Sequence, residues 1–382
     1  MSILDQISNP FDMLRGTEPV PAYKITIDGK DITTLVKPRL MSLTLTDNRG
    51  FEADQVELQL DDADGKLTLP RRGASMRAWL GWKGTPLIDK GSFTVDELEH
   101  AGAPDTLTIT GRSVDFRESL NVKKERSFHG KKLSEIIDTI AKNNGLFSIL
   151  STSLKDEVID HIDQTNESDA AFLVRLAKEF DTIPTVKDGR LLFVRAGLAL
   201  TATGKAMPPL IITRKAGDNH RFSVADRDAY TGVVAYWHDK KAAEKKVVKL
   251  KRRRRKKKTT TTAAVTTTDT ITPAAVVKEN ELLIGSDENV KTLRHIYANQ
   301  KNAERAAKAH WQRLQRGVAE FSMTLAMGRP ELITELPVTV RGIKPQIEEA
   351  KWISKKVVHI VTGDNGYTTN VEFEVKIDEL PE

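Results

Sequence analysis

Short stretches of alternating hydrophobic and polar residues dominate the first third of the chain. Tyr23, Ile25 and Ile27 fall on one face of an extended strand, and five later stretches alternate in the same way. Alternation of period two is typical of strands that bury one face. Several short strands without a long helix predict an antiparallel β-sandwich or barrel. The five later stretches contain Met41–Leu45, Val56–Leu60, Met76–Trp82, Phe93–Val95 and Leu107–Ile109.

The spacing becomes helical between about residues 128 and 196. Leu133, Ile136, Ile137 and Ile140 recur at i, i+3, i+4 and i+7, which places them on one face of a helix. Gly145 stands where the C-terminal cap of that helix would fall. The pattern therefore predicts a helix that ends just before Gly145.

A second helix and a hairpin are expected in the stretch His161–Val194. Asn166 or Ser168 can cap the helix, because a short side-chain oxygen accepts hydrogen bonds from its first free amides. Asp188-Gly189 is a strong two-residue turn signal between short strands at Thr185–Lys187 and Arg190–Val194. The apolar face of the helix would consist of Phe172, Leu173, Leu176 and Phe180.

Strands are expected again in the remainder of the chain, on both sides of an unpatterned region. Lys240–Thr272 contains a basic run and a Thr/Ala tract, which predict an extended or disordered loop. A long helix is expected from Ser286 or Asp287, ending at Gly317. The expected strands are Leu210–Arg214, His220–Ala225, Thr231–Trp237, Phe321–Met327, Val338–Val340, and the pair Lys356–Thr362 and Thr368–Ile377 joined by an Asn365-Gly366 turn.

The positive charge of the chain is concentrated in one run. The formal net charge is +6, and Lys249–Lys258 (KLKRRRRKKK) alone contributes nine positive charges. The remainder is near −3, which does not favour a nucleic-acid-binding surface over the whole body. The chain has no cysteine, no apolar run of about 18 residues and no secretory pattern at its N-terminus, so we expect neither disulfides nor membrane insertion.

No constellation of residues predicts catalysis, a cofactor or a metal site. The eight histidines are scattered, without an HExxH pair. His161 and Asp163 are interpreted as a polar pair at a strand end, and His359 as a hydrogen-bonded core residue. Asp62–Gly65 is expected to form a turn rather than a calcium loop. The carboxylate pairs Asp61-Asp62 and Asp96-Glu97 are neighbours along strands, so their side chains should point to opposite faces and cannot flank one glycosidic bond.

Two separated motifs resemble one protein family. Gln164–Glu179 (QTNESDAAFLVRLAKE) and Lys187–Phe193 (KDGRLLF) are similar to the capped helix and hairpin of phage late control gene D proteins and of the hub part of VgrG. The resemblance continues in Trp352-Ile353, Val357-Val358-His359 and Gly366–Thr369. It covers most of the chain apart from Ala242–Glu288.

The resemblance implies a non-enzymatic baseplate hub of a contractile tail or tail-like particle. It implies a homotrimer that joins a six-fold tail tube or tube-initiator protein to a three-fold spike protein, with the tape-measure protein as a further partner. It also implies host cytoplasm during assembly and then the tail baseplate. The expected fold is mainly β with α+β, comprising a first tube-like barrel (1–118), a small α+β domain (119–205), a second tube-like barrel (206–239 and 317–382), and a loop-and-helix insertion (240–316).

Other functions remain open for the basic run. A solvated loop, contact with nucleic acid and docking on an acidic partner surface are all compatible with clustered cations. A DNA-binding regulator is therefore the alternative to a hub, and an enzyme acting on peptidoglycan is a third, weaker reading. The candidate contact residues are Lys249, Lys251, Arg252, Arg253, Arg254, Arg255, Lys256, Lys257 and Lys258.

Overall fold

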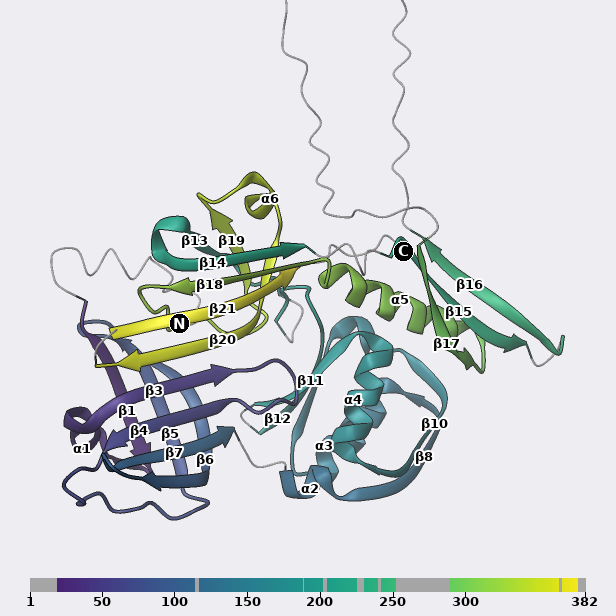
Figure 1. The fold of residues 1–382 in the computed structure, drawn as a ribbon. Coiled ribbons are helices and arrows are strands. Elements are labelled where there is room, and N and C mark those ends of the chain that lie inside the picture. Colours follow the sequence, from purple (N-terminus) through teal and green to yellow (C-terminus); the bar gives the residue numbers. More distant parts are fainter. Residues whose placement is uncertain are drawn as a thin grey trace, which may run out of the picture. The chain divides into compact units, whose positions relative to one another are not determined.

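The computed structural model describes residues 19–113, 117–187, 189–201, 205–224, 230–239, 242–251, 289–363 and 366–376. Over these residues the chain is mainly β with a central α+β region, as the sequence predicted (Figure 1). Closure of the β regions into tubes stays a prediction. The chain divides into two compact units, Met1–Ser223 together with Ala319–Glu382, and Val224–Val318.

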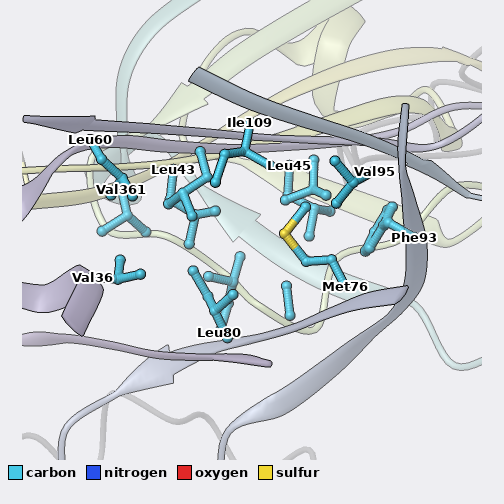
Figure 2. Packing of buried hydrophobic residues seen from close by; sticks show 14 of the residues in the cluster. Val36, Leu43, Leu45, Leu60, Met76, Leu80, Phe93, Val95, Ile109 and Val361 are labelled. Carbon is cyan, nitrogen blue, oxygen red and sulfur yellow. The ribbon is translucent and has the colours of Figure 1, made fainter. Parts of the chain in front are cut away.

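The first unit begins with the N-terminal β region, which contains every strand expected there. Its strands lie in the order β3-β4-β7-β6-β5-β1-β2. Their buried faces form one apolar core, in which Leu43, Leu45, Met76, Leu80 and Phe93 point into a common interior (Figure 2). The elements are β1 (Pro21–Ile27), β2 (Lys30–Asp31), α1 (Thr33–Val36), η3 (Lys37–Arg39), β3 (Leu40–Asp47), β4 (Gln55–Asp61), β5 (Ser75–Trp82), β6 (Ile88–Ala101) and β7 (Thr106–Ser113).

One residue of the expected alternation lies on the other face. Met41 was expected to share the buried face with Leu43 and Leu45, but its side chain is 42% exposed. The register of β3 against β4 shifts between Leu40 and Ser42. Such an irregularity moves one residue out of the alternation. Leu40 packs against the core in place of Met41.

The α+β region follows, with its own core. Ser168 caps α4 by accepting a hydrogen bond from the amide of Ala171 at 3.2 Å. Of the two candidate caps, Ser168 and not Asn166 is therefore the one used. The buried faces of α3 and α4 are those predicted, and β11 and β12 pair as the expected hairpin. The elements are α2 (Arg117–Asn121), β8 (Lys123–Lys132), α3 (Leu133–Asn143), β9 (Phe147–Leu150), η4 (Thr152–Leu154), β10 (Val158–Ser168), α4 (Asp169–Phe180), β11 (Thr182–Lys187) and β12 (Arg190–Arg195).

The C-terminal β region completes the first unit and continues the sheet of the N-terminal β region. The strand order runs β14-β18-β21-β20 and then directly to β3, because β20 pairs with β21 on one side and with β3 on the other. The pairing of β20 with β3 extends from Val357–Asp47 to Thr362–Ser42. The elements are β13 (Leu210–Thr213), η5 (Arg214–Ala216), β14 (Gly217–Val224), β18 (Ala319–Leu325), β19 (Pro337–Arg341), α6 (Pro345–Glu348), β20 (Trp352–Thr362) and β21 (Gly366–Val375).

The second unit is a three-stranded sheet covered by one helix. Strands β15 (Gly232–Asp239), β16 (Glu244–Lys251) and β17 (Val290–Tyr297) lie in the order β16-β15-β17. Helix α5 (Gln300–Arg316) contacts all three strands. It buries Ala303, Ala307 and Trp311, which fall on one helical face.

The second unit corrects three expectations. Glu244–Lys251, expected as part of a loop, is a strand, because Val248 and Leu250 alternate with lysines and lie opposite the buried Ala235 and Val233. Val290–Tyr297, expected as the start of the long helix, is a strand paired in parallel with β15, and the helix begins only after its cap Asn299. Strand β15, expected in the second barrel, belongs to this separate sheet. The rest of the expected loop, from Arg252 onward, lies outside the described residues.

Candidate functional site

The β3–β4 loop is the point at which the three regions of the first unit meet. It spans the residues between Asp47 and Asp54, and we call it the junction loop. Phe51 packs against the core of the α+β region. A side chain added at Gly50 would contact Ile183 of β11 at 3.7 Å. The loop thus extends from the N-terminal β region onto the α+β region.

Asp47 connects the junction loop to both other regions. Its carboxylate accepts hydrogen bonds from Lys187 Nζ at 3.1 Å and from the backbone amide of Thr334 at 2.9 Å. Lys187 ends β11 of the α+β region, and Thr334 precedes β19 of the C-terminal β region. One carboxylate therefore binds groups from two regions that are distant in sequence.

Asp54 lies beside the same lysine. Its Oδ2 is 3.6 Å from Lys187 Nζ, and its Oδ1 accepts the amide of Asn48 at 2.9 Å. Burial raises the pKa of Asp54 to about 6, and the nearby Asp47 carboxylate acts in the same direction while Lys187 opposes it. The lysine therefore holds two neighbouring carboxylates that would otherwise repel each other.

Arg49 forms a second connection from the junction loop to the C-terminal β region. Its guanidinium pairs with Glu335 at 2.5 Å and with Glu374 at 2.6 Å. All three side chains are less than one fifth exposed. Glu335 also accepts the backbone amide of Gly197 at 3.0 Å. Disrupting an ion pair that is this shielded from water lowers the stability of the protein more than disrupting a surface pair does.

A buried polar cluster lies where the two β regions join. His359 of β20 and Thr369 of β21 face each other in the strand register, and both are fully buried. His359 Nδ1 lies 3.1 Å from Thr369 Oγ1 and 2.9 Å from the Tyr367 hydroxyl. Its Nε2 lies 2.9 Å from Lys90 Nζ of β6. The carbonyl oxygen of Leu332 also lies 3.3 Å from Nε2, but the Lys90 contact is shorter. Because an ammonium group only donates, we assign Nε2 as the acceptor from Lys90 and place the proton of the neutral ring on Nδ1.

This cluster separates two apolar cores along a single strand. On the buried face of β20, Val357 belongs to the C-terminal core and Val361 to the N-terminal core, with His359 between them. The prediction that His359 is a hydrogen-bonded core residue is confirmed. A buried polar group that must find its partners fixes the register in which the strands pair.

Burial shifts the pKa values of the cluster. It lowers the pKa of Lys90 to about 8, and it lowers the pKa of His359 well below its ordinary value, with the Lys90 charge adding to the effect. It also raises the pKa of Tyr367 well above its ordinary value. The histidine and the tyrosine are therefore both neutral near pH 7.

The QTNESD motif builds a second buried network, inside the α+β region. Asp169 is fully buried at the start of α4. Its carboxylate binds Lys124 at 2.6 Å, Asn144 at 2.8 Å and Gln164 at 3.0 Å, and it also pairs with Arg126. These partners come from β8, β10 and the end of α3, so one carboxylate fixes three elements to α4.

The exposed part of the same motif supports the turn into the helix. Glu167 pairs with Arg175, whose Nη2 lies 2.7 Å from Oε2. The same Nη2 also donates to the carbonyl oxygen of Asp163 at 2.6 Å. Asn166 has a φ of +48°, at a register irregularity between β10 and β8. The motif residues thus have structural roles, and a shallow polar hollow of about 550 Å³ lies over them.

The remaining candidate residues form ion pairs and turns. Asp62 accepts the amide of Leu67 and Gly65 N donates to Asp62 O, so the segment is the expected turn. Asp96 and Glu97 both contact Arg112, at 2.6 and 3.8 Å, because an irregularity between Val95 and Glu97 interrupts the alternation. The expectation that their side chains point to opposite faces is therefore wrong.

Neither a metal-binding cluster nor a membrane-spanning helix is found among the described residues. No group of three His, Cys, Asp or Glu side chains in the described ranges is placed to hold a metal ion. None of the helices that the structure describes is long and apolar enough to cross a membrane.

The candidate contact residues of the basic run are only partly described. Lys249 and Lys251 lie in β16, and Lys249 is exposed on it. Arg252, Arg253, Arg254, Arg255, Lys256, Lys257 and Lys258 lie outside the described residues.

Charge differs strongly between the two units. Counted along the sequence, Val224–Val318 holds 22 of the 59 Lys and Arg residues but only 10 of the 53 Asp and Glu residues. The other unit keeps 37 cationic and 43 anionic residues, so it is acidic. The second unit is therefore a basic module even outside the run that the sequence singled out.

Sequence reasoning missed the residues of the junction. Asp47, Lys90 and Glu335 are ordinary charged residues in sequence, without motif or spacing, and Lys187 stands out only as the first residue of the KDGRLLF motif. Only the pairing of β20 with β3 and the position of β11 bring them together. The one signal available was His359, a histidine in an otherwise apolar strand.

Comparison with known proteins identifies the family. The family model of the phage tail baseplate hub (GPD) matches residues 34–366. The probable baseplate hub protein of Escherichia phage P2 is 48% identical over 371 residues, covering 96% of each chain. The one of Escherichia phage 186 is 47% identical over 372 residues, covering 96% of this chain and 95% of that protein.

A solved structure agrees at the level of the fold. The tail protein from Neisseria meningitidis MC58 superposes with a TM-score of 0.61 at 13% identity, covering 93% of this chain and 96% of that chain. Given the match of the family model over most of its length, the chain belongs to the phage tail baseplate hub family.

Proposed function

We propose that this chain is the trimeric hub that joins a six-fold tail tube to a three-fold spike. The observation that carries the proposal is the sheet shared by the two β regions, joined through β20 and β3. Each subunit presents two β regions, so three subunits present six. A ring of this kind offers six similar surfaces at one end and three-fold symmetry at the other.

The junction gives the protomer the stiffness that an adaptor needs. Asp47, Arg49 and His359 tie the N-terminal β region, the α+β region and the C-terminal β region together through shielded polar contacts. In a closed ring each subunit contacts the next through different surfaces. Rigid subunits then keep the angle between neighbours constant.

The partners follow from this position in the tail. We propose a spike protein on the three-fold side, a tube or tube-initiator protein on the six-fold side, and the tape-measure protein as a further partner. The hub would be assembled in the host cytoplasm before it becomes part of the baseplate. An obligate ring of this kind buries more than about 2,000 Å² at each subunit contact.

Native mass spectrometry and a structure of the assembled particle test the proposal. We expect a mass of three chains for the hub, and three copies in the baseplate between tube and spike. We also expect the N-terminal and C-terminal β regions to superpose on each other. A monomer or dimer in the particle, or two unrelated β folds, would rule out the trimeric adaptor.

A second candidate function is contact with nucleic acid through the basic module. The charge difference between the two units favours it, since 22 cationic residues accompany 10 anionic ones in Val224–Val318. The contact residues would be Lys249 and Lys251 with the adjoining Arg252–Lys258. Clustered cations release counterions from phosphates, which makes such binding strongly dependent on salt.

Fluorescence anisotropy with a labelled DNA duplex at 50 and 200 mM salt tests this second function. We expect the affinity to fall steeply with salt, and the slope to shrink when Lys249 and Lys251 are changed to Ser. Absence of binding at 50 mM salt would exclude a nucleic-acid contact.

A further inference from the structure

Two histidines that are distant in sequence meet on the outer face of the β8–β10 hairpin. The strand register places His161 directly opposite His129, and Asp163 opposite Ser127. Side chains two positions apart on a strand share a face, so all four lie together. His129 is exposed, and the side chains of His161 and Asp163 are 53% and 45% exposed. The sequence alone gave no reason to connect His129 with His161.

Asp163 determines which nitrogen of His161 carries the proton. Its Oδ2 lies 2.9 Å from His161 Nε2, and its Oδ1 accepts a hydrogen bond from the Ser127 hydroxyl at 2.6 Å. A carboxylate only accepts, so Nε2 is protonated and donates to it. The Nδ1 atom of neutral His161 is then unprotonated, and its lone pair can accept a hydrogen bond from His129 Nδ1 or bind a metal ion. This carboxylate-to-histidine arrangement is the one that supports histidine ligands in metal sites.

The lone pair of His161 faces the second histidine. The two Nδ1 atoms are 3.0 Å apart, whereas the ring centroids are 4.5 Å apart, so the Nδ1 edges of both rings turn toward each other. With bonds of about 2.1 Å to each nitrogen, an ion between them would have an N–metal–N angle of about 90°. That angle belongs to neighbouring ligands of a square-planar or octahedral ion.

We propose that His129 and His161 form a surface site for a divalent transition-metal ion, in which Asp163 orients His161 by accepting a hydrogen bond from its Nε2. The site is separate from the junction and goes beyond the role of a hub. The site has two protein ligands, and the Asp163 carboxylate supports His161 without binding the metal. This agrees with the lack, among the described residues, of any group of three His, Cys, Asp or Glu side chains placed to hold a metal ion.

The geometry selects a class of ion. Imidazole nitrogens at about 90° suit Cu²⁺ and Ni²⁺, which prefer tetragonal arrangements, more than a tetrahedral ion. Only two positions are filled by the chain, and the hairpin face is exposed. The other positions are open to water or to donor atoms of another molecule.

Calorimetric titration of the full chain with Ni²⁺, in a buffer that does not chelate and without an affinity tag, tests the site. We expect one ion per chain, and loss of saturable binding in both His129→Ala and His161→Ala. Asp163→Asn should weaken the affinity by about tenfold, because it removes the supporting carboxylate while keeping both ligands. The matched control is His100→Ala, since His100 is a half-exposed histidine that also lies beside a carboxylate, Asp62, at 3.3 Å.

Two further results distinguish a specific metal site from nonspecific metal adsorption. Electron paramagnetic resonance of the Cu²⁺ form should show nitrogen ligation that disappears in His161→Ala. Binding that persists in both alanine variants, or that falls equally in His100→Ala, would overturn the proposal, as would absence of saturable binding in the unmodified chain. Because both histidines are exposed, thermal melting should be the same for all variants, and His161→Gln provides a second variant if His161→Ala melts early.

Discussion

The indole nitrogen of Trp82 donates a buried hydrogen bond of 3.0 Å to the carbonyl oxygen of Gly328, which joins the N-terminal β region to the segment after β18. The amide of Gly328 in turn donates to the carbonyl oxygen of Tyr367 at 2.7 Å. The Tyr367 ring lies against Trp82, with centroids 5.3 Å apart. Gly328 is therefore enclosed between the side chains of Trp82 and Tyr367, and its carbonyl and amide groups hydrogen-bond to these two residues.

Substitution of Gly328 tests how closely the two β regions are packed. A Cβ atom at this position would lie 2.4 Å from atoms of the Tyr367 ring, which cannot move without disturbing His359. We expect Gly328→Ala to lower the free energy of unfolding by about 1–3 kcal/mol in urea denaturation. Gly363→Ala is the control, because no atom lies within 4 Å of its added carbon. Equal stability of the two variants would contradict the packing.

The stability of the first unit should fall in mild acid because of His359. Its pKa is well below the ordinary value of 6.5 in the fold, so the unfolded chain takes up a proton below pH 6.5 that the folded chain does not. This group therefore lowers the free energy of unfolding by up to about 1.4 kcal/mol per pH unit as the pH drops below 6.5. His359→Gln should show a shallower loss between pH 6.5 and 5 in urea denaturation. Identical slopes for both proteins would show that His359 does not control the acid response.

The salt bridges of Lys187 should matter more at neutral than at acidic pH. Lys187→Met removes the ion pairs of Asp47 and Asp54 with Lys187, and we expect the free energy of unfolding to fall by about 1–3 kcal/mol at pH 7.5. The loss is smaller than for a fully buried pair because the Lys187 side chain is 41% exposed. At pH 5 the loss should be smaller, since the pKa of Asp54 is about 6 and its protonated form needs no partner. Lys66→Met, which removes an exposed pair with Asp64, should change stability by less than about 0.5 kcal/mol. A pH-independent loss would count against the shared role of Lys187.

The network of Asp169 should dominate the stability of the α+β region. Asp169→Ala leaves two cations without their buried partner, and we expect a loss of about 3 kcal/mol or more. Asp169→Asn should lose less, because the amide oxygen still accepts hydrogen bonds. The control is Glu135→Gln, in a pair with Lys131 that is half exposed on both sides. Hydrogen exchange of α3 and α4 locates the effect, and an unchanged exchange rate in Asp169→Ala would contradict it.

The part of the basic run that follows β16, Arg252–Lys258, can be tested separately from the strand itself. Replacing 240–272 with a Gly/Ser linker removes β16 and uncovers the β15 edge of the second unit, so we expect the thermal midpoint of that unit to fall by more than about 5 °C. Changing Arg252–Lys258 to Ser keeps β16 and should leave the midpoint within about 2 °C. Calorimetry distinguishes the two, and a deletion without effect would show that β16 adds no stability.

Local patterns predicted most of the elements and the family. Alternation in β4 and β5 and the helical spacing in α4 are short-range features, and each appears where expected. The resemblance in Gln164–Glu179 and Lys187–Phe193 led to the family that the comparisons establish. Because the matched family is the phage tail baseplate hub and both relatives are named probable baseplate hub proteins, the prediction of a structural rather than enzymatic protein is confirmed.

Features that depend on distant partners could not be predicted. Val290–Tyr297 looked helical because Val290, Leu293 and Tyr297 fall at nearly helical intervals, and its parallel pairing with β15 overrode that spacing. The junction has the same origin, since Asp47 and Thr334 are brought together only by the folded sheet. Such contacts depend on the arrangement of regions, which no single stretch of sequence contains.

The pairing of β20 with β3 has a consequence for synthesis of the chain. Ribosomes add about 5–20 residues per second, so the partner of β3 emerges tens of seconds after β3 itself. Contacts such as Arg49–Glu374 span 325 positions and form only after Glu374 has been synthesised. Until then one side of β3 is an unpaired strand edge that can pair with another nascent chain. Folding of the first unit is thus completed only after β20 and β21 have been synthesised, and slow or truncated synthesis should yield aggregated chains.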